Sequence, residues 1–219
     1  MKPKPYTCLF VDWHLTLSTS VFWEQFSKPE HPQHRLFACM QAALFAPAGV
    51  ETWGIPWMRG EFTSEEVVEG VCRGTDLDPV FAFQELQSSC RRMRLVSEAI
   101  PRCIRDLRAK GLKVVIATDN MDTFHRWTVP GLRLHTLFDD VLSSWQLRAL
   151  KEDRGQYGQS LFFASYMRAH GIGRGESLLL DDGDEAFGSI IRQFGIDFQH
   201  IEPGKGLAPA LQEIVASFA

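Results

Sequence analysis

Short apolar segments alternate with helical patterns along most of the chain, and this alternation limits the fold more than any other feature. The segments typical of strands are TCLFVD, LKVVIATDN, TLFDDVLSS, ESLLLDD and GIDFQHI, which end at or near Asp12, Thr118, Ser143, Asp181 and Ile201. The first, second and fourth have almost continuous apolar cores, as strands buried on both faces do. The helical patterns between them stop at glycines, which often end helices. The sequence therefore predicts an α/β fold with a parallel sheet and right-handed crossovers.

Residues 18–96 interrupt this alternation and carry helical patterns together with much of the Trp and Phe. In FTSEEVVEGVC, Thr63 and Glu66 have the spacing of a capping box ahead of an amphipathic run. We expect a small helical domain inserted after the first strand, with residues 1–17 and 97–219 forming the α/β core. Trp53, Trp57 and Met58 are expected either in the core of the inserted domain or in an apolar lid over a substrate.

Polar residues stand at the carboxyl ends of the predicted strands, which is where parallel sheets bind ligands. Asp12 and Thr118 end the first two strands, Asp181 and Asp182 end the fourth, and Lys151 lies beyond the third. Clustered carboxylates repel one another unless a cation joins them. Mg²⁺ prefers oxygen ligands and retains waters that a phosphate can replace. The pattern therefore favours Mg²⁺-dependent phosphoryl chemistry with an aspartate nucleophile.

In this order, the motifs resemble those of haloacid dehalogenase-like hydrolases, and the resemblance covers almost the whole chain. LFVDWHLTL resembles the first motif of that family, usually an apolar run followed by D-x-D-G-T-L. VVIATDN resembles the second motif, LFDDVLSSWQLRALK the segment ending in the third-motif lysine, and LLLDDGDEA the acidic fourth motif. The resemblance implies a Rossmann-like parallel sheet flanked by helices, with residues 18–96 as a small helical cap.

The resemblance also implies a magnesium site. Asp12 would be both the nucleophile and a Mg²⁺ ligand, and the backbone carbonyl of His14 would be a second ligand. Asp182 best matches the metal ligand of the fourth motif, and Asp181 would bind the metal directly or support it.

A phosphate site is implied next to the metal. Thr118, with the backbone N–H groups of Asp119 and Asn120 beyond it, would hold phosphate oxygens. Lys151 would bridge Asp12 and the phosphate and neutralise their charge. The implied substrate is a small phosphorylated metabolite.

The sequence departs from the family pattern at several positions. Phosphatases of the family usually have an aspartate two residues after the nucleophile, where it protonates the leaving group and later activates water. That position is His14 here, and histidine can act as acid and base near neutral pH. Leu15 replaces the usual glycine and restricts the backbone of the turn. Glu152 replaces the common proline after Lys151, and DRGQY is inserted beyond it.

These observations leave three functional hypotheses, of which a phosphatase acting through an aspartyl-phosphate at Asp12 is preferred. Because His14 replaces the usual acid, the second hypothesis is a catalytically impaired protein that binds a metal, a phosphorylated ligand or a protein partner. The third is hydrolysis of a C–P or C–halogen bond, since relatives with those activities also lack the second aspartate. The paired acids at Asp181 and Asp182 favour a metal and argue against dehalogenation.

Composition and charge exclude several other classes of protein. The chain has 219 residues, a formal net charge of −4 and no basic block, so nothing favours binding to nucleic acid or to an anionic membrane surface. The longest nearly apolar stretch, LFACMQAALFAPAGV, contains Gln41 and breaks at Pro47, so we expect a buried helix there. The 5 cysteines form no C-x-x-C pair and no secretory segment is recognisable, so we expect reduced thiols in a cytoplasmic protein. The sequence does not predict an oligomeric state.

Overall fold

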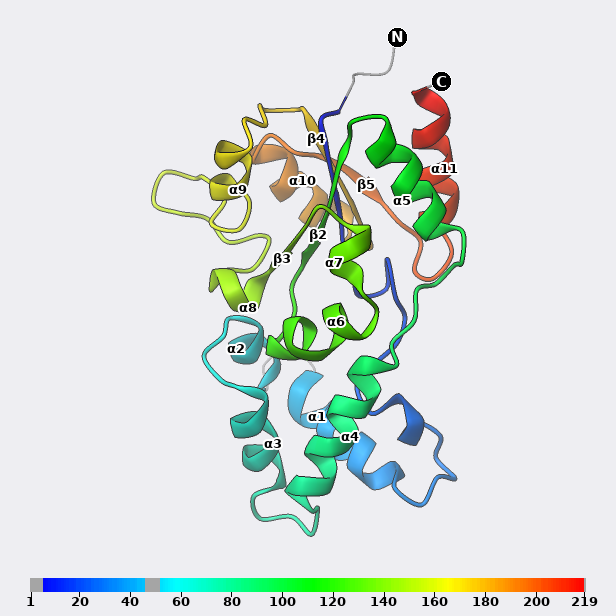
Figure 1. The fold of residues 1–219 in the computed structure, drawn as a ribbon. Helices are drawn as coiled ribbons and strands as arrows, with labels where there is room; N and C mark the ends of the chain where they lie inside the picture. Colours follow the sequence, from blue (N-terminus) through cyan, green and yellow to red (C-terminus); the bar gives the residue numbers. More distant parts are fainter. Residues whose placement is uncertain (1–5, 46–51, 219) are drawn as a thin grey trace.

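The computed structural model describes residues 6–45 and 52–218, and it has a five-stranded sheet in one lobe and helices in the other (Figure 1). The strands are β1 (Cys8–Val11), β2 (Lys113–Thr118), β3 (Asp140–Ser143), β4 (Ser177–Asp181) and β5 (Asp197–His200). Every neighbouring pair is parallel, and the order in the sheet is β3-β2-β1-β4-β5. The predicted α/β fold with a parallel sheet is therefore confirmed.

Helices cover both faces of the sheet, which explains why the central strands are apolar without interruption. In β1, Leu9 and Val11 belong to one buried cluster, and Cys8 and Phe10 belong to the other. The first cluster includes side chains of α5 and α11, and the second includes side chains of α9 and α10. The core helices and helical turns are α5 (Ile100–Ala109), η2 (Phe124–Thr128), α6 (Val129–Gly131), α7 (Leu134–Leu137), α8 (Ser144–Leu147), α9 (Ala164–Ala169), α10 (Glu185–Gln193) and α11 (Leu207–Ser217).

The helices around the sheet end where the sequence predicts, but one strand is shorter than expected. Gly111 and Gly195, which follow α5 and α10, both adopt a φ of 87°, a conformation that glycine tolerates best. The strand predicted over TLFDDVLSS covers only β3, because α7 extends into the start of that segment. The carboxylate of Asp139 accepts the Val114 N–H at 2.8 Å and pairs with Arg108 at 2.9 Å, so the chain joins the sheet only after Asp139.

The second lobe, called the cap here, contains η1 and α1 to α4 and lies at the carboxyl edge of the sheet (Figure 1). Thr63 and Glu66 make both hydrogen bonds of the predicted capping box. The apolar stretch from Leu36 forms a helix as far as Phe45, and the rest of that stretch lies outside the described residues. The domain boundaries given above stay a prediction. The described helical segments of the cap are η1 (Glu24–Phe26), α1 (His34–Phe45), α2 (Gly54–Met58), α3 (Ser64–Cys72) and α4 (Pro79–Arg91).

A buried carboxylate of the core fixes the cap in place. Asp122 lies four residues beyond β2 and is 1% exposed. Its oxygens accept hydrogen bonds from Trp57 Nε1 at 2.8 Å and from Ser64 Oγ at 2.6 Å, and both donors belong to the cap. They also accept from the Ser64 N–H at 3.1 Å and from Arg126 Nη1 at 2.8 Å. This satisfied carboxylate is a strong anchor, because each of its donors would be costly to leave unpaired in the interior.

The inserted residues after Lys151 supply a second attachment. Asp153 accepts two hydrogen bonds from the guanidinium of Arg59 in the cap, one of them from Nη2 at 2.8 Å. The same carboxylate accepts the backbone N–H of Leu150 at 2.8 Å, which holds the chain just before Lys151. The insertion therefore links the cap to the loop that carries Lys151.

None of the helices in the described ranges combines the length and the hydrophobicity needed to cross a bilayer. The described cysteines, Cys8, Cys39, Cys72, Cys90 and Cys103, are all free thiols.

Candidate active site

The turn after β1 presents Asp12 at the carboxyl edge of the sheet. Its N–H donates to the Leu180 carbonyl at 2.9 Å, so the backbone stays tied to β4 one residue beyond the strand, and the residue is 4% exposed. Leu15 adopts a φ of 60° in the tight turn that follows. A left-handed conformation costs a non-glycine residue about 1–2 kcal/mol. Leucine therefore takes the conformation that a glycine would adopt more easily, and the turn forms at that cost.

Lys151 brings the first and fourth motifs together. Its Nζ atom donates to Asp12 Oδ1 at 2.7 Å and to Asp181 Oδ2 at 2.5 Å, and the residue is 5% exposed. Its backbone N–H donates to Asp119 Oδ1 at 3.0 Å, which fixes the start of the side chain beside the second motif. Residues that are far apart in the sequence thus meet at one buried point on the sheet edge.

Negative charge exceeds positive charge at this point. Burial raises the pKa of Asp12, and the neighbouring Asp181 and Asp182 raise it further, while Lys151 opposes the rise. Burial would lower the pKa of Lys151, but the attraction of Asp12, Asp181 and Asp119 raises it, so the ammonium stays charged. Burial and then Asp181 also raise the pKa of Asp182. An additional cation would relieve the repulsion among these carboxylates.

The donor set is suitable for Mg²⁺ but is not a complete protein cage. Within the described ranges, no three His, Cys, Asp or Glu side chains are grouped closely enough to hold a metal. Mg²⁺ usually binds one or two carboxylates and fills its other positions with water and phosphate. Asp12 and Asp182 could supply carboxylate oxygens, together with the His14 carbonyl. Both oxygens of Asp181 are engaged, Oδ2 by Lys151 and Oδ1 by the Gly183 N–H at 2.8 Å, so Asp182 is the better ligand.

The second motif offers one polar group without a partner. Thr118 is fully buried, and its hydroxyl has no hydrogen-bond partner among the described residues. A phosphate oxygen would supply that partner. The N–H of Asn120, for which a phosphate contact is predicted, donates to Ser144 Oγ at 2.9 Å, and Asn120 Oδ1 accepts the Met121 N–H at 2.9 Å. The backbone N–H of Asn120 therefore already has an acceptor within the core, Ser144 Oγ, with which a phosphate oxygen would compete.

Asp119 and His14 lie between this site and the cap. Burial raises the pKa of Asp119 to about 6, although Lys151 opposes the rise. Solvent reaches His14, but the residue stands in a concave site where many protein atoms surround the ring. The resulting desolvation lowers the pKa of His14, while Asp182 raises it. His14 is therefore mainly neutral at pH 7.

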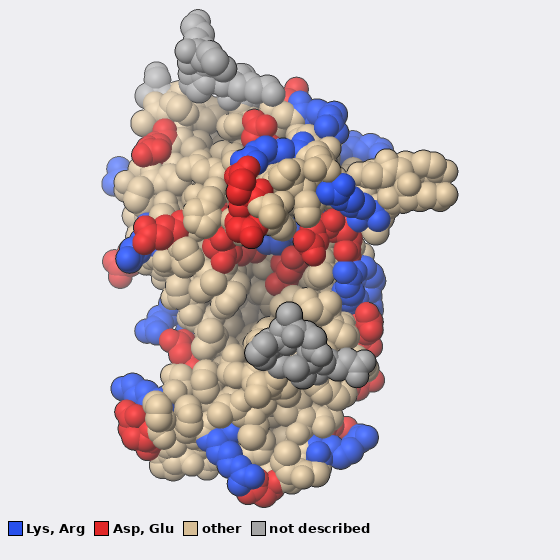
Figure 2. All heavy atoms as spheres, turned by 180° about the vertical axis from the view of Figure 1, so that it is seen from behind, with Lys and Arg blue, Asp and Glu red and all other residues tan. Residues whose placement is uncertain are grey.

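A cavity of about 480 Å³ extends from these two residues into the cap. Gln41 and Phe45 of α1 and Met58 of α2 line it from the cap, and Trp13 and Met121 line it from the core. Figure 2 shows acidic side chains on the core lobe beside the waist of the molecule, while the surfaces at the waist itself are mostly uncharged. The phosphate site and the cavity thus differ sharply in polarity.

Several of these features have no clear signal in the sequence. Trp57 is fully buried and hydrogen-bonded to Asp122, Met58 lines the cavity, and Trp53 packs on Phe62 with ring centroids 5.0 Å apart. The cluster is therefore divided between cap core and cavity wall. The spacing of Asp122 and Arg126, four residues apart, could have indicated an ion pair, but nothing local indicates Trp57 or Ser64 as partners.

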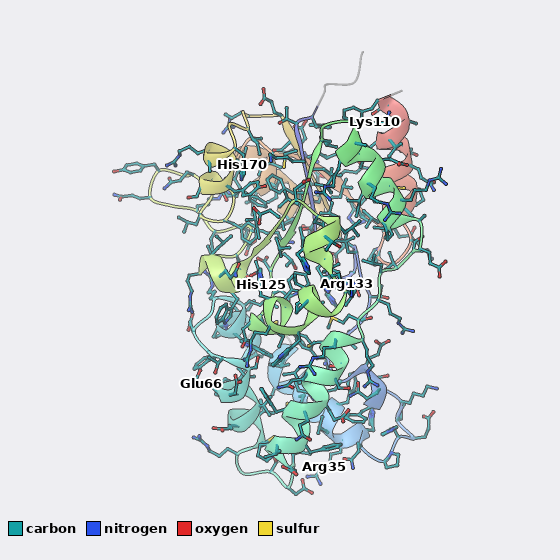
Figure 3. The ribbon with its side chains drawn as sticks, in the orientation of Figure 1. Arg35, Glu66, Lys110, His125, Arg133 and His170 are labelled. Carbon is teal, nitrogen blue, oxygen red and sulfur yellow. The ribbon has the colours of Figure 1, made fainter. Side chains whose placement is uncertain are left out.

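Several other histidines and basic residues lie away from the site. Figure 3 shows His170 and Lys110 in the part of the core farthest from the cap, and Arg35 at the far end of the cap. His125 lies near the junction of the two lobes, on η2, but it is not among the residues that line the cavity. His200 lies closer, with its Nδ1 atom 2.9 Å from the carbonyl oxygen of Gly183 in the fourth motif, but it does not line the cavity, whereas His14 does.

Comparison with known proteins identifies the fold. No family model and no curated protein matches the sequence. A structure described as a predicted HAD-like family hydrolase from Porphyromonas gingivalis superimposes with a TM-score of 0.71 at 17% identity, covering 97% of this chain and 98% of that one. A HAD family enzyme from Bacteroides thetaiotaomicron, in complex with magnesium and inorganic phosphate, gives a TM-score of 0.64 at 14% identity, covering 91% and 96%.

An L-2-haloacid dehalogenase from Xanthobacter autotrophicus, with chloropropionic acid covalently bound, gives a TM-score of 0.62 at 15% identity, covering 98% of this chain and 84% of that one. The chain therefore has the haloacid dehalogenase-like fold that its motifs predict. At this level of identity the similarity establishes the fold, and the reaction has to be argued from the site.

Proposed function

We propose that this protein is a Mg²⁺-dependent phosphatase that hydrolyses a small organic phosphate monoester through an aspartyl-phosphate at Asp12. The observation that carries the proposal is the buried ammonium of Lys151, which contacts both Asp12 and Asp181. It holds the nucleophile next to the acidic fourth motif, where a phosphate would meet positive charge. The unpartnered Thr118 hydroxyl supports the same position for a phosphate oxygen.

In the first half-reaction, a carboxylate oxygen of Asp12 attacks phosphorus. The P–O bond to the organic group breaks, and the imidazolium form of His14 gives its proton to the departing oxygen. Lys151 and the Thr118 hydroxyl hold the phosphate oxygens as their charge shifts. Bound Mg²⁺ supplies further neutralisation of phosphate charge.

In the second half-reaction, neutral His14 takes a proton from water as that water attacks the phosphorus of the aspartyl-phosphate. The bond between phosphorus and Asp12 breaks, which releases inorganic phosphate and restores the carboxylate. The two steps need opposite protonation states of His14. Because the pKa of His14 is lowered, little of the imidazolium form is present for the first step. We therefore expect a slow enzyme.

The test is a phosphatase assay on the purified protein with Mg²⁺, using alkyl phosphates and p-nitrophenyl phosphate. His14→Ala should reduce turnover of alkyl phosphates by about 10²–10⁴-fold, the usual contribution of a general acid–base group, and affect the nitrophenyl ester much less. The nitrophenolate leaves without help. His14→Asp, which restores the common motif, should keep or raise activity. If the wild type is inactive on every phosphate and His14→Asp gains turnover, the protein has a binding role instead.

A second candidate is hydrolysis of a carbon–halogen bond. The apolar cavity beside Asp12 and the lack of an aspartate at position 14 favour it. The acidic pair at Asp181 and Asp182 opposes it, because a halide displacement needs no metal. Halide release from 2-haloacids, without Mg²⁺ dependence, would support this candidate over the phosphatase.

A further inference from the structure

The cavity between the lobes has a composition that restricts the organic part of a substrate. Its apolar walls are Trp13, Phe22, Phe45, Met58, Met93 and Met121. Its volume of about 480 Å³ falls within the range of small-molecule sites. A dry apolar cavity of about 150 Å³ takes one benzene ring, so this one has room for a group of about two rings.

No lysine or arginine is found among the described residues that line the cavity. A second phosphate, or a carboxylate, would therefore enter it without a cationic partner, and burying an unpaired charge is costly. Three of the walls are methionines, whose polarisable sulfur makes favourable contacts with aromatic rings. The lining thus favours an uncharged, ring-bearing group over a sugar or a bisphosphate.

Among the described cap-side residues that line the cavity, only Gln41 has a buried side-chain donor without an acceptor. It lies in α1, and its Nε2 atom is buried without a hydrogen-bond partner although the side chain lines the cavity. The other polar cap-side residue, Ser20, already accepts the Arg94 N–H at 3.2 Å. A buried amide donor without a partner favours a ligand that brings an acceptor to it.

The cavity borders the proposed phosphate site. His14 and Asp119 line its core end, and Asp119 accepts the backbone N–H of Lys151. A phosphate at Lys151 would therefore place its ester oxygen near His14, with the organic group directed into the cap. On the cap side, the lining residue Phe45 is 48% exposed to solvent.

We propose that the cavity binds an uncharged, ring-bearing alcohol esterified to the phosphate, and that the Gln41 amide donates a hydrogen bond to an oxygen on its ring. This proposal rests on the proposed phosphatase function for the position of the phosphate. The ligand class itself follows from the cavity alone.

The kinetic test compares primary alkyl phosphates with similar leaving groups, so that only the organic part differs. The probes are 2-(2-naphthyl)ethyl phosphate, its 6-methoxy derivative, ethyl phosphate and glucose 6-phosphate. We expect kcat/KM for the methoxynaphthyl ester to exceed that for ethyl phosphate and glucose 6-phosphate by at least about 100-fold, or about 2.7 kcal/mol. Equal or better turnover of glucose 6-phosphate would overturn the inference and leave the phosphatase intact.

Two cap variants locate the effect. Gln41→Leu should lower the methoxy-to-plain naphthyl ratio of kcat/KM by about 10-fold, as expected for a lost buried hydrogen bond. Gln84→Leu, on the exposed side of α4, is the matched control and should leave the ratio unchanged. Val21 also lines the cavity, so Val21→Trp should fill it and remove most of the preference for naphthyl over ethyl phosphate. A ratio that Gln41→Leu leaves unchanged would overturn the role of Gln41.

A binding measurement separates this inference from the proposed function. The alcohol 2-(6-methoxy-2-naphthyl)ethanol should bind wild-type protein in calorimetry, and Val21→Trp should weaken that binding by at least about 10-fold. Binding without turnover of any phosphate would support the cavity assignment while overturning the phosphatase. Turnover of phosphates without binding of this alcohol and without a preference for ring-bearing esters would support the phosphatase and overturn the cavity assignment.

Discussion

Two buried carboxylates at the same edge of the sheet have opposite surroundings. Asp122 is surrounded by neutral and cationic donors, with Trp57, Ser64 and Arg126 satisfying both of its oxygens. Asp12 has one cation, Lys151, and feels the repulsion of Asp181 and Asp182. The comparison indicates that a satisfied carboxylate holds the cap to the core. An incompletely neutralised one is available to a metal and a phosphate.

Replacing the incompletely neutralised carboxylate should have the largest effect on activity. Asp12→Asn removes the nucleophile, so phosphate turnover should fall by about 10³-fold or more. The free energy of unfolding of this variant should hardly change, because the amide has the same shape as the carboxylate and the repulsion from Asp181 is relieved. Urea unfolding and a phosphate-release assay measure the two effects on one preparation. Retained turnover would exclude Asp12 as the nucleophile.

Replacing the satisfied carboxylate should mainly affect stability. Asp122→Ala leaves the donors of Trp57 and Ser64 buried without an acceptor, so the free energy of unfolding should fall by about 3–5 kcal/mol. The control is Glu65→Ala, which breaks the exposed ion pair on the other side of Arg126 and should cost less than about 1 kcal/mol. Equal losses in the two variants would contradict the anchoring role of Asp122.

Metal binding should stabilise the protein through the Asp12 cluster. If millimolar Mg²⁺ is in large excess over its dissociation constant, it should add about 1–3 kcal/mol to the free energy of unfolding at pH 8. The gain should be smaller at pH 6, because the raised pKa values of Asp12 and Asp182 mean that protons then compete with the metal. Thermal unfolding at constant ionic strength measures this.

Asp182→Asn is the matched variant for the metal prediction and should reduce the gain from Mg²⁺ at pH 8. An unchanged melting temperature in the wild type across the Mg²⁺ range would count against a metal site. It would then favour the non-enzymatic hypothesis.

The smallest effect is expected at Asp119, which stands between the two environments. A carboxyl group whose folded-state pKa is raised favours the protein in its protonated form. Its stabilising contribution is therefore complete below its unfolded pKa of about 4 and lost as the pH rises through about 6. Asp119→Asn keeps the acceptor for Lys151 and should gain about 1 kcal/mol over the wild type at pH 7.5 but almost nothing at pH 4. A larger gain at pH 4 would contradict the raised pKa.

The sequence by itself determined the features that depend on neighbours along the chain. Apolar runs ending at Asp12 and Thr118 predict strands with polar ends, Gly111 ends a helix, and Thr63 with Glu66 starts another. Each pattern is local. Side chains within about four positions decide where a helix ends, and the alternation of side chains along a strand decides which face each one occupies. The order of motifs then predicted the fold, because parallel strands bring their carboxyl ends to one edge.

Only the tertiary structure decided which of these residues meet and what surrounds them. Lys151 and Asp12 are separated by 139 positions, and Asp122 and Trp57 by 65, so their contacts depend on how the crossovers and the cap pack. The same holds for Gln41, whose buried amide has meaning only because α1 forms the cap side of the cavity. Leu15 adopts a left-handed conformation because contacts throughout the turn outweigh its local preference. Burial and long-range pairing, which set pKa values and cavity chemistry, arise only when distant segments exclude water together.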